Sequence, residues 1–335
     1  MTTNHLRGNQ INRFRIARDK GGKYLSKFLH SDGSFGDPNI GAVEYYKVPA
    51  ALMACGETES ANRLLSWIRK YGITEEGDFG PRHPAEKNTY YYAYYNTWII
   101  IASQRMRQFD LSRRGMDFLL NFRDPETGGF YSSLIERKPS TLQDIWVVSG
   151  CGIAALSTGM IDIAKGVGYW LNNILSIQPD YPKKLYTVYS RSNGLYTPTN
   201  SQDPFRHVLD TELEKDQSFF HPGIAGGFLA LLYQATGENK WLELSKEYML
   251  LAEIANPYLW RLLRAGKIGW CASVLYTLTG EKIYKDMAIK VGNNLISSQS
   301  EEGYWKADGS DNPSNDITAE MVVWLDEIYQ SIGSL

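Results

Sequence analysis

Four titratable side chains occur where they could move protons to or from a bound small molecule: Asp144, His221, Asp316 and Glu320. Each lies at or near the start of a segment rich in apolar and small residues, which is the pattern of a buried helix. Burial and neighbouring charges can shift the pKa of a carboxylate or an imidazole towards the working pH, as general acid–base catalysis requires. These four residues are therefore the predicted catalytic groups, and no metal ion or other cofactor is expected to assist them.

Three of the four also have a structural interpretation. A carboxylate at Asp144 or Asp316 can cap a helix, because it accepts hydrogen bonds from backbone N–H groups and suits the helix dipole. His221 can be a capping or packing residue beside the proline that follows it, which suits the first turn of a helix. The next residues are small and would admit a ligand beside His221, and the preceding segment supplies Asp210 or Glu212 as a carboxylate partner.

Aromatic and polar residues near the same helix starts are predicted to bind the substrate. Tyrosines are concentrated around Tyr91 and Tyr95, and they cannot all face the core from one helix, so some must face a cavity or the loops. Aromatic rings could shape a substrate and stabilise a developing cation. The predicted substrate-binding set is Arg82, Tyr91, Tyr95, Asn96, Trp146, Arg264 and Trp305.

A repeated unit supplies the helices that must position these residues. In each copy an apolar segment ends in a turn, usually at a glycine suited to the left-handed position past a helix end, and a segment of mixed polarity follows. The turn glycines stand at positions 56, 159, 237, 280 and 333, and an equivalent turn without glycine falls near Arg107. Six such units predict helical hairpins, whose inner helices should begin near Ile40, Tyr91, Gln143, His221, Arg264 and Ile317.

The sixth unit ends without room for its outer helix. Residues 11–29 have no inner helix before them, so we expect this segment to pack against the sixth inner helix and close a ring. The predicted fold is all-α: a single (α/α)6 toroid domain over residues 1–335. Short turns should crowd one end of the ring, while the longer returns, 77–92, 130–143, 179–220 and 303–316, frame a central cavity at the other end.

Loops that join a glycine to an aromatic residue follow most of the expected outer helices. The copy at 294–305, Asn-Leu-Ile-Ser-Ser-Gln-Ser-Glu-Glu-Gly-Tyr-Trp, resembles the Gln-Trp repeat of squalene and hopene cyclases. The resemblance implies the α/α toroid that terpenoid cyclases share with protein prenyltransferase β-subunits. The turn at 235–240 is similar to turns of six-hairpin sugar-active proteins, including glycosidases and sugar epimerases. The sequence lacks the Asp-x-Asp-Asp and Asp-Asp-x-x-Asp motifs of the first group and a convincing Asp, Cys and His zinc set.

Three functional hypotheses follow. The main one is an enzyme that cyclises or isomerises a largely apolar, isoprenoid- or polyketide-like molecule by metal-independent acid–base chemistry in a central aromatic cavity. The second is a carbohydrate-active hydrolase, lyase or epimerase, in which paired carboxylates act and aromatic rings stack on sugars. The third is a noncatalytic toroid that binds a ligand.

Composition restricts the partners. The net charge of -2 without a polybasic or acidic block argues against nucleic acid or anionic membrane as the main partner, which leaves a small-molecule substrate. No targeting signal is visible, and the longest apolar runs are too short to span a bilayer. Cys55, Cys151 and Cys271 lie in apolar helical contexts typical of reduced thiols, which predicts a cytoplasmic protein. The oligomeric state is left open.

Overall fold

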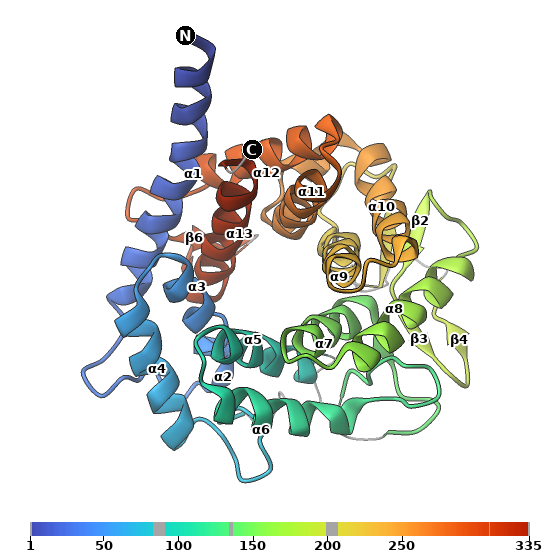
Figure 1. Cartoon of the computed structure of the whole chain (residues 1–335), viewed down its shortest axis with the longest axis horizontal. Helices are drawn as coiled ribbons and strands as arrows, with labels where there is room; N and C mark the ends of the chain where they lie inside the picture. Colours follow the sequence, from blue (N-terminus) through green and yellow to red (C-terminus); the bar gives the residue numbers. More distant parts are fainter. Residues whose placement is uncertain (1, 83–90, 134–136, 199–206, 308, 334–335) are drawn as a thin grey trace.

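Antiparallel helix pairs form a closed ring in the computed structural model, which describes residues 2–82, 91–133, 137–198, 207–307 and 309–333 (Figure 1). The inner helices are α3 (Val48–Ala54), α5 (Tyr92–Arg105), α7 (Ile145–Ser157), α9 (Phe220–Thr236), α11 (Gly266–Thr279) and α13 (Asn315–Gly333). The outer helices are α1 (Thr2–Ser26), α4 (Thr58–Tyr71), α6 (Phe109–Leu119), α8 (Ile161–Ser176), α10 (Asn239–Ile254) and α12 (Lys282–Ser297). The predicted (α/α)6 toroid is therefore confirmed.

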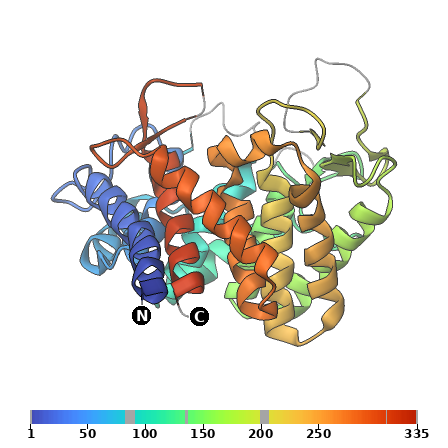
Figure 2. The same cartoon turned by 90° about the horizontal axis from the view of Figure 1, so that it is seen from above.

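Each inner helix packs against the next around the ring, and α13 packs against α3 to complete it. The side view separates the two ends of the ring (Figure 2). The longer returns gather at one end, which we call the loop end. The short turns and both chain termini lie at the other, which we call the turn end. None of the described helices combines the length and apolarity needed to cross a bilayer.

The turns between inner and outer helices confirm the repeat. Gly237 and Gly280 end α9 and α11 in the left-handed conformation, with φ of 69° and 72°. At the equivalent turn after α5 the chain has no glycine, and Arg107 adopts a φ of 61° instead. A non-glycine residue at positive φ carries a steric cost, so the packing of the hairpin must hold this turn in place.

The glycine–aromatic loops lock neighbouring hairpins together. Phe35, Phe79, Phe130 and Trp305 are fully buried, which confirms that these rings plug the gaps between hairpins. The glycine before each ring lies against the backbone of the next outer helix: a Cβ on Gly128 would stand 2.7 Å from the Gly166 oxygen of α8. Tyr196 in the fourth copy is the exception, because its side chain is exposed.

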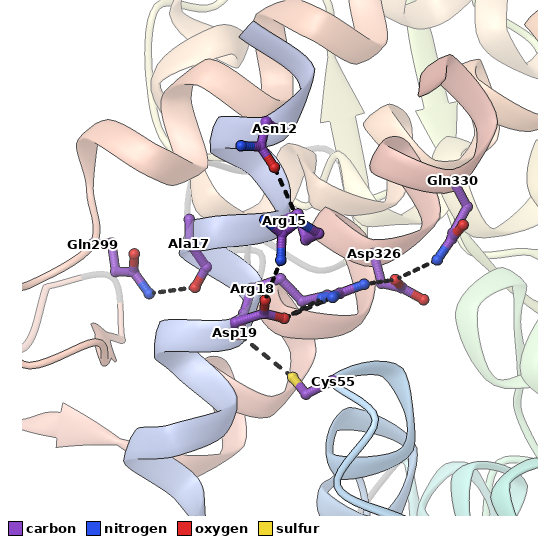
Figure 3. Close-up of polar contacts among 9 residues, drawn as sticks. All are labelled: Asn12, Arg15, Ala17, Arg18, Asp19, Cys55, Gln299, Asp326 and Gln330. Atoms are coloured by element: carbon purple, nitrogen blue, oxygen red, sulfur yellow. Dashed lines mark hydrogen bonds and ion pairs between the residues drawn. The ribbon is translucent and has the colours of Figure 1, made fainter. Parts of the chain in front are cut away.

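The same loop contact shows that α1 is the sixth outer helix. A Cβ on Gly303 would stand 2.5 Å from the backbone oxygen of Lys20 in α1. Gln299, the glutamine of the Gln-Trp-like motif, donates to the Ala17 oxygen of α1 at 2.9 Å (Figure 3). On the inner side, Arg18 of α1 forms a buried ion pair with Asp326 of α13 at 2.5 Å. The predicted closure by the N-terminal segment is thus confirmed.

We expect the Arg18→Met variant to lower the free energy of unfolding by about 2 kcal/mol, because it leaves the Asp326 carboxylate mostly buried without its cation. For a chain of 335 residues this corresponds to a melting temperature about 3 °C lower. Arg15→Met, one turn away on α1, is the matched control: its pair with Asp19 is partly exposed and should contribute under about 0.5 kcal/mol. Equal melting temperatures for the two variants would contradict the role of Arg18 in closing the ring.

The returns contain short structure that the sequence did not predict. β2 (Lys184–Tyr186) pairs with β5 (Val208–Asp210), β3 (Val188–Ser190) pairs with β1 (Gln143–Asp144) and β4 (Gly194–Leu195), and β6 (Trp305–Lys306) pairs with β7 (Pro313–Ser314). Strands of two or three residues are too short to show an alternating pattern. Short helical segments also occur: α2 (Ala42–Tyr45), which precedes α3, and the 3-10 segments Leu120–Phe122, Pro257–Arg261 and Leu263–Ala265.

Candidate active site

A cavity of about 310 Å³ opens at the loop end of the ring axis. All six inner helices contribute to this cavity, each through residues near the start of the helix. The cavity thus lies at the end of the ring where the long returns were expected to frame it. A volume of this size lies near the lower limit of small-molecule sites. The lining residues are Val43, Tyr46, Lys47, Tyr91, Tyr95, Trp146, Phe220, Leu263, Arg264, Lys267, Ala307, Asp316, Ile317, Glu320 and Met321. We call this the loop-end cavity.

Aromatic side chains form one continuous wall of the loop-end cavity. Ring centroids are 4.4 Å apart between Tyr46 and Tyr95, 5.8 Å between Tyr95 and Tyr91, and 5.6 Å between Tyr91 and Trp146. Phe220 continues the wall at 5.0 Å from Trp146. Such a wall can pack against the apolar face of a ring-shaped ligand while its edges remain free for polar contacts.

A buried layer of charge lies on the opposite side, where α13 meets α3 and α11. Glu320 stands between two lysines: one carboxylate oxygen accepts a hydrogen bond from Lys47 and the other from Lys267. The indole N–H of Trp324 also donates to Glu320, at 3.2 Å. The two lysines are each 4% exposed and Glu320 is 8% exposed. We call Lys47, Glu320 and Lys267 the charged layer.

Glu320 and Lys47 remain charged because neighbours of opposite charge offset the cost of burying them. Burial alone would raise the pKa of Glu320, but the adjacent Lys267 and Lys47 outweigh it and hold the pKa well below its ordinary value. Burial alone would lower the pKa of Lys47, but Asp316 and Glu320 outweigh it and raise the pKa. Glu320 is thus ionised near neutral pH, where it holds both lysine side chains at the cavity surface and has no proton to donate.

Asp316 is the carboxylate that remains accessible. It lies in the first turn of α13, its Oδ1 is 2.9 Å from the Lys47 ammonium, and its side chain is 32% exposed. Arg264, from the short 3-10 segment before α11, also lines the cavity and pairs with Asp216. The loop-end cavity therefore presents one partly exposed carboxylate beside fixed cations.

His221 and Asp144 form a separate, fully buried pair. The imidazole Nδ1 is 3.0 Å from the Ser218 oxygen, and Nε2 is 3.2 Å from Oδ2 of Asp144. The other oxygen of Asp144 accepts from the backbone N–H groups of residues 146 and 147, so Asp144 is the N-cap of α7. Phe220 stacks on the imidazole and itself faces the loop-end cavity. The partner of His221 is thus Asp144, and the predicted pairing with Asp210 or Glu212 is wrong, because those carboxylates pair with Lys184 and Lys183.

A catalytic role for His221 stays a prediction, and its geometry favours a structural one. Both ring nitrogens face acceptors, and the pair joins the starts of α7 and α9. We expect His221→Gln to lower the free energy of unfolding by about 1–3 kcal/mol, the cost of disturbing a buried hydrogen-bonded pair, with turnover changed less than about tenfold. A loss of about 10²–10⁴-fold in turnover at unchanged stability would instead establish His221 as an acid–base group. Thermal unfolding and kinetics on the same preparation separate the two outcomes.

Three of the predicted substrate-binding residues, Arg82, Asn96 and Trp305, are not among the described lining of the loop-end cavity. Asn96 is fully buried, accepts from Arg82 at 2.6 Å and donates to Asp78 at 3.0 Å. The Arg82 guanidinium packs 4.8 Å from the Tyr95 ring. Trp305 is fully buried and donates to the Leu295 oxygen at 2.8 Å, so it packs between hairpins. Tyr91, Tyr95, Trp146 and Arg264 do line the cavity, as do Asp316 and Glu320.

Sequence reasoning missed Lys47 and Lys267. Each is a lone charge in an otherwise apolar helix start, within Tyr45–Ala51 and Gly266–Ala272. A charge in such a context is rarely buried without a partner, and that signal could have identified both. Tyr46 and Phe220 were also missed. Among the described residues, no group of three or more His, Cys, Asp and Glu side chains could hold a metal ion.

Several solved structures with the same fold are sugar-active enzymes. No family model matches the sequence, and no curated protein matches it. A D-mannose isomerase shares 13% identity over 95% of this chain and 97% of its own, with a TM-score of 0.68. A GH76A α-1,6-mannanase from Salegentibacter sp. HEL1_6 shares 12% over 95% and 99%, with a TM-score of 0.66. An unsaturated glucuronyl hydrolase specific for heparin shares 11% over 98% of both chains, with a TM-score of 0.64.

These similarities correct the resemblance to terpenoid cyclases. The chain has the six-hairpin toroid found in glycosidases and a sugar isomerase. The Gln-Trp-like motif is not specific for terpenoid cyclases. Its glutamine and tryptophan join adjacent hairpins, and any ring of helical hairpins needs such contacts. Identities of 11 to 13% establish the fold alone.

Proposed function

We propose that this chain is an enzyme that acts on a sugar in the loop-end cavity, by proton transfer at the carbon next to a carbonyl group. The product would be an isomerised or epimerised sugar. The observation that carries the proposal is the pairing of one partly exposed carboxylate, Asp316, with the fixed ammonium groups of Lys47 and Lys267 in the same cavity. The similarity to a D-mannose isomerase supports a substrate of this class.

Each part of the cavity has a role in this reaction. The aromatic wall packs against one face of the sugar, which positions its C–H bond towards α13. The Asp316 carboxylate accepts the proton from the carbon beside the carbonyl, and the electron pair moves onto the carbonyl oxygen. The lysine ammonium groups stabilise the enediolate that results, since they are held in place before the charge develops. For isomerisation, the hydroxyl proton on the deprotonated carbon's oxygen passes to the former carbonyl oxygen, and the carbon-bound proton returns to the former carbonyl carbon. For epimerisation, the electron pair moves back from the oxygen and a proton is added to the opposite face of the deprotonated carbon.

Glycoside hydrolysis is less well supported. It normally needs two carboxyl groups on either side of the scissile bond, one of them protonated. Glu320 cannot supply that proton, because the lysines hold its pKa well below the ordinary range. The mannanase is inactive when two consecutive aspartates are changed, and this sequence contains no two consecutive aspartates. The apolar-substrate hypothesis is also weaker, because the charged layer faces the cavity.

The test is incubation of the purified protein with free aldoses and ketoses in D₂O, followed by NMR. We expect interconversion with deuterium incorporated at the carbon next to the carbonyl of the preferred sugar. The same sugar should raise the melting temperature by mass action, whereas isoprenoid-like ligands should not. Release of new reducing ends from mannosides or uronides, without deuterium incorporation, would overturn the proposal in favour of a hydrolase.

A further inference from the structure

A second cavity, of about 280 Å³, opens at the turn end of the ring axis. We call it the turn-end cavity. The charged layer separates it from the loop-end cavity: Trp324, whose indole binds Glu320, and Trp98, which packs 5.9 Å from the Lys47 ammonium, both line its inner part. Nothing in the proposed sugar chemistry uses this space.

The walls of the turn-end cavity are mainly apolar. Trp324 packs 5.3 Å from Trp270 and 5.7 Å from Trp98, and Ile153 and Leu231 face the same space. Trp98 and Arg105 lie seven residues apart on α5, so the cavity is roughly 10 Å deep at the helical rise of about 1.5 Å per residue. This depth suits one aromatic ring carried on a short alkyl chain.

The mouth of the turn-end cavity favours positive charge. Arg105 and Glu327 are the charged residues among its described lining, and Arg105 is 53% exposed on its side chain against 29% for Glu327. Their contact is loose, at 3.7 Å, so Arg105 can turn into solvent. Burial raises the pKa of Glu327 although Arg105 opposes this, which marks a carboxylate poorly neutralised by its present partner.

The carboxyl ends of two helices add to the preference of the turn-end cavity for a cation. Arg105 and Ser157 are the last residues of α5 and α7, and both line the cavity. The carboxyl ends of helices carry partial negative charge, which favours a cation within the last turn. Glu327 and the helix ends would repel an anionic ligand and attract a cation, which would take the place of Arg105 in its loose contact with Glu327.

From these observations we infer that the turn-end cavity is a binding site for an organic ammonium ion with an apolar, aromatic body. The body packs against the tryptophans, and the ammonium group pairs with Glu327 at the mouth. The inference does not depend on the proposed sugar chemistry, because the two cavities lie on opposite sides of the charged layer.

The test uses three probes of one shape, 3-phenylpropylammonium, 3-phenylpropanol and 3-phenylpropionate, titrated into the full-length protein by calorimetry. We expect the ammonium probe to bind tightest and to change tryptophan fluorescence. Glu327→Gln should weaken its binding about fivefold, and the exposed Glu59→Gln control should leave it unchanged. Ser157→Trp, which fills the mouth, should abolish binding of the ammonium probe.

Arg264→Gln, a change in the loop-end cavity, distinguishes the two sites, since it should leave ammonium binding unchanged. Thermal unfolding confirms that each variant is folded. Binding of the carboxylate probe as tight as that of the ammonium probe would overturn the inference. So would undiminished binding in folded Glu327→Gln and Ser157→Trp, loss of binding in Arg264→Gln, or no binding up to about 10 mM, the range of the weakest ligand contacts.

Discussion

Asp316→Asn is expected to lower the turnover of the preferred sugar by about 10²–10⁴-fold, the usual contribution of a positioned acid–base group. The amide keeps the shape of the side chain but cannot accept the proton. Stability should change little, because Asp316 is 32% exposed and Lys47 keeps Glu320 as a partner. Steady-state kinetics and deuterium exchange from solvent would both record the loss.

Asp311→Asn is the matched control for this result. Asp311 lies in the same return, is fully exposed and pairs loosely with Lys306 at 3.5 Å, so its neutralisation should leave turnover unchanged. The loss in Asp316→Asn should appear in kcat, with KM changed less than about threefold, since the group acts in the chemical step. Turnover equal to that of the natural protein would remove Asp316 from the mechanism.

The second large effect is on stability and concerns the charged layer. Glu320→Gln should lower the free energy of unfolding by about 3–5 kcal/mol, because it removes the carboxylate that Lys267 pairs with and leaves the buried Lys47 with Asp316 alone. For a chain of 335 residues the melting temperature should fall by about 4–7 °C. Glu59→Gln on the exposed side of α4 should change the free energy of unfolding by less than about 0.5 kcal/mol.

A triple variant separates the contribution of the charged layer to stability from its contribution to sugar turnover. Lys47→Met, Glu320→Leu and Lys267→Met together replace buried charges with apolar side chains of similar size, a change that is often neutral or stabilising. We expect its free energy of unfolding to return to within about 1 kcal/mol of the natural protein, while sugar turnover is lost with the ammonium groups. If the triple variant were as unstable as Glu320→Gln, unpaired charge would not be the cause of the destabilisation.

The same layer predicts how stability depends on pH. The folded protein holds the pKa of Glu320 below its ordinary value of 4.5, so the folded state binds fewer protons than the unfolded state as the pH falls. The contribution of Glu320 to stability is therefore fully present above about pH 5 and is lost progressively below pH 4.5. Denaturant unfolding between pH 3 and 7 should show this loss, and the triple variant should show a smaller one over the same range.

The ring could be predicted from local sequence patterns. Each turn glycine and each glycine–aromatic loop reflects a local requirement, such as a left-handed residue after Thr236 or a close backbone approach at Gly303. Local requirements recur at every hairpin, so the repeat could be counted without knowing any contact. Because no outer helix follows α13 in the sequence, α1 was the expected partner of α13. The Arg18–Asp326 ion pair confirms that the two helices pack together.

Local patterns could not predict which polar residues share a cavity. Asp144 and Asp316 occupy similar positions at helix starts, yet one is a buried cap bound to His221 and the other faces the loop-end cavity. More than two hundred residues separate Lys47 from Lys267 along the chain. The closed ring brings both lysines within hydrogen-bond distance of Glu320. Spacing along a chain specifies the local conformation, but contacts across a closed ring depend on how the hairpins rotate and pack, and these are set by the whole core.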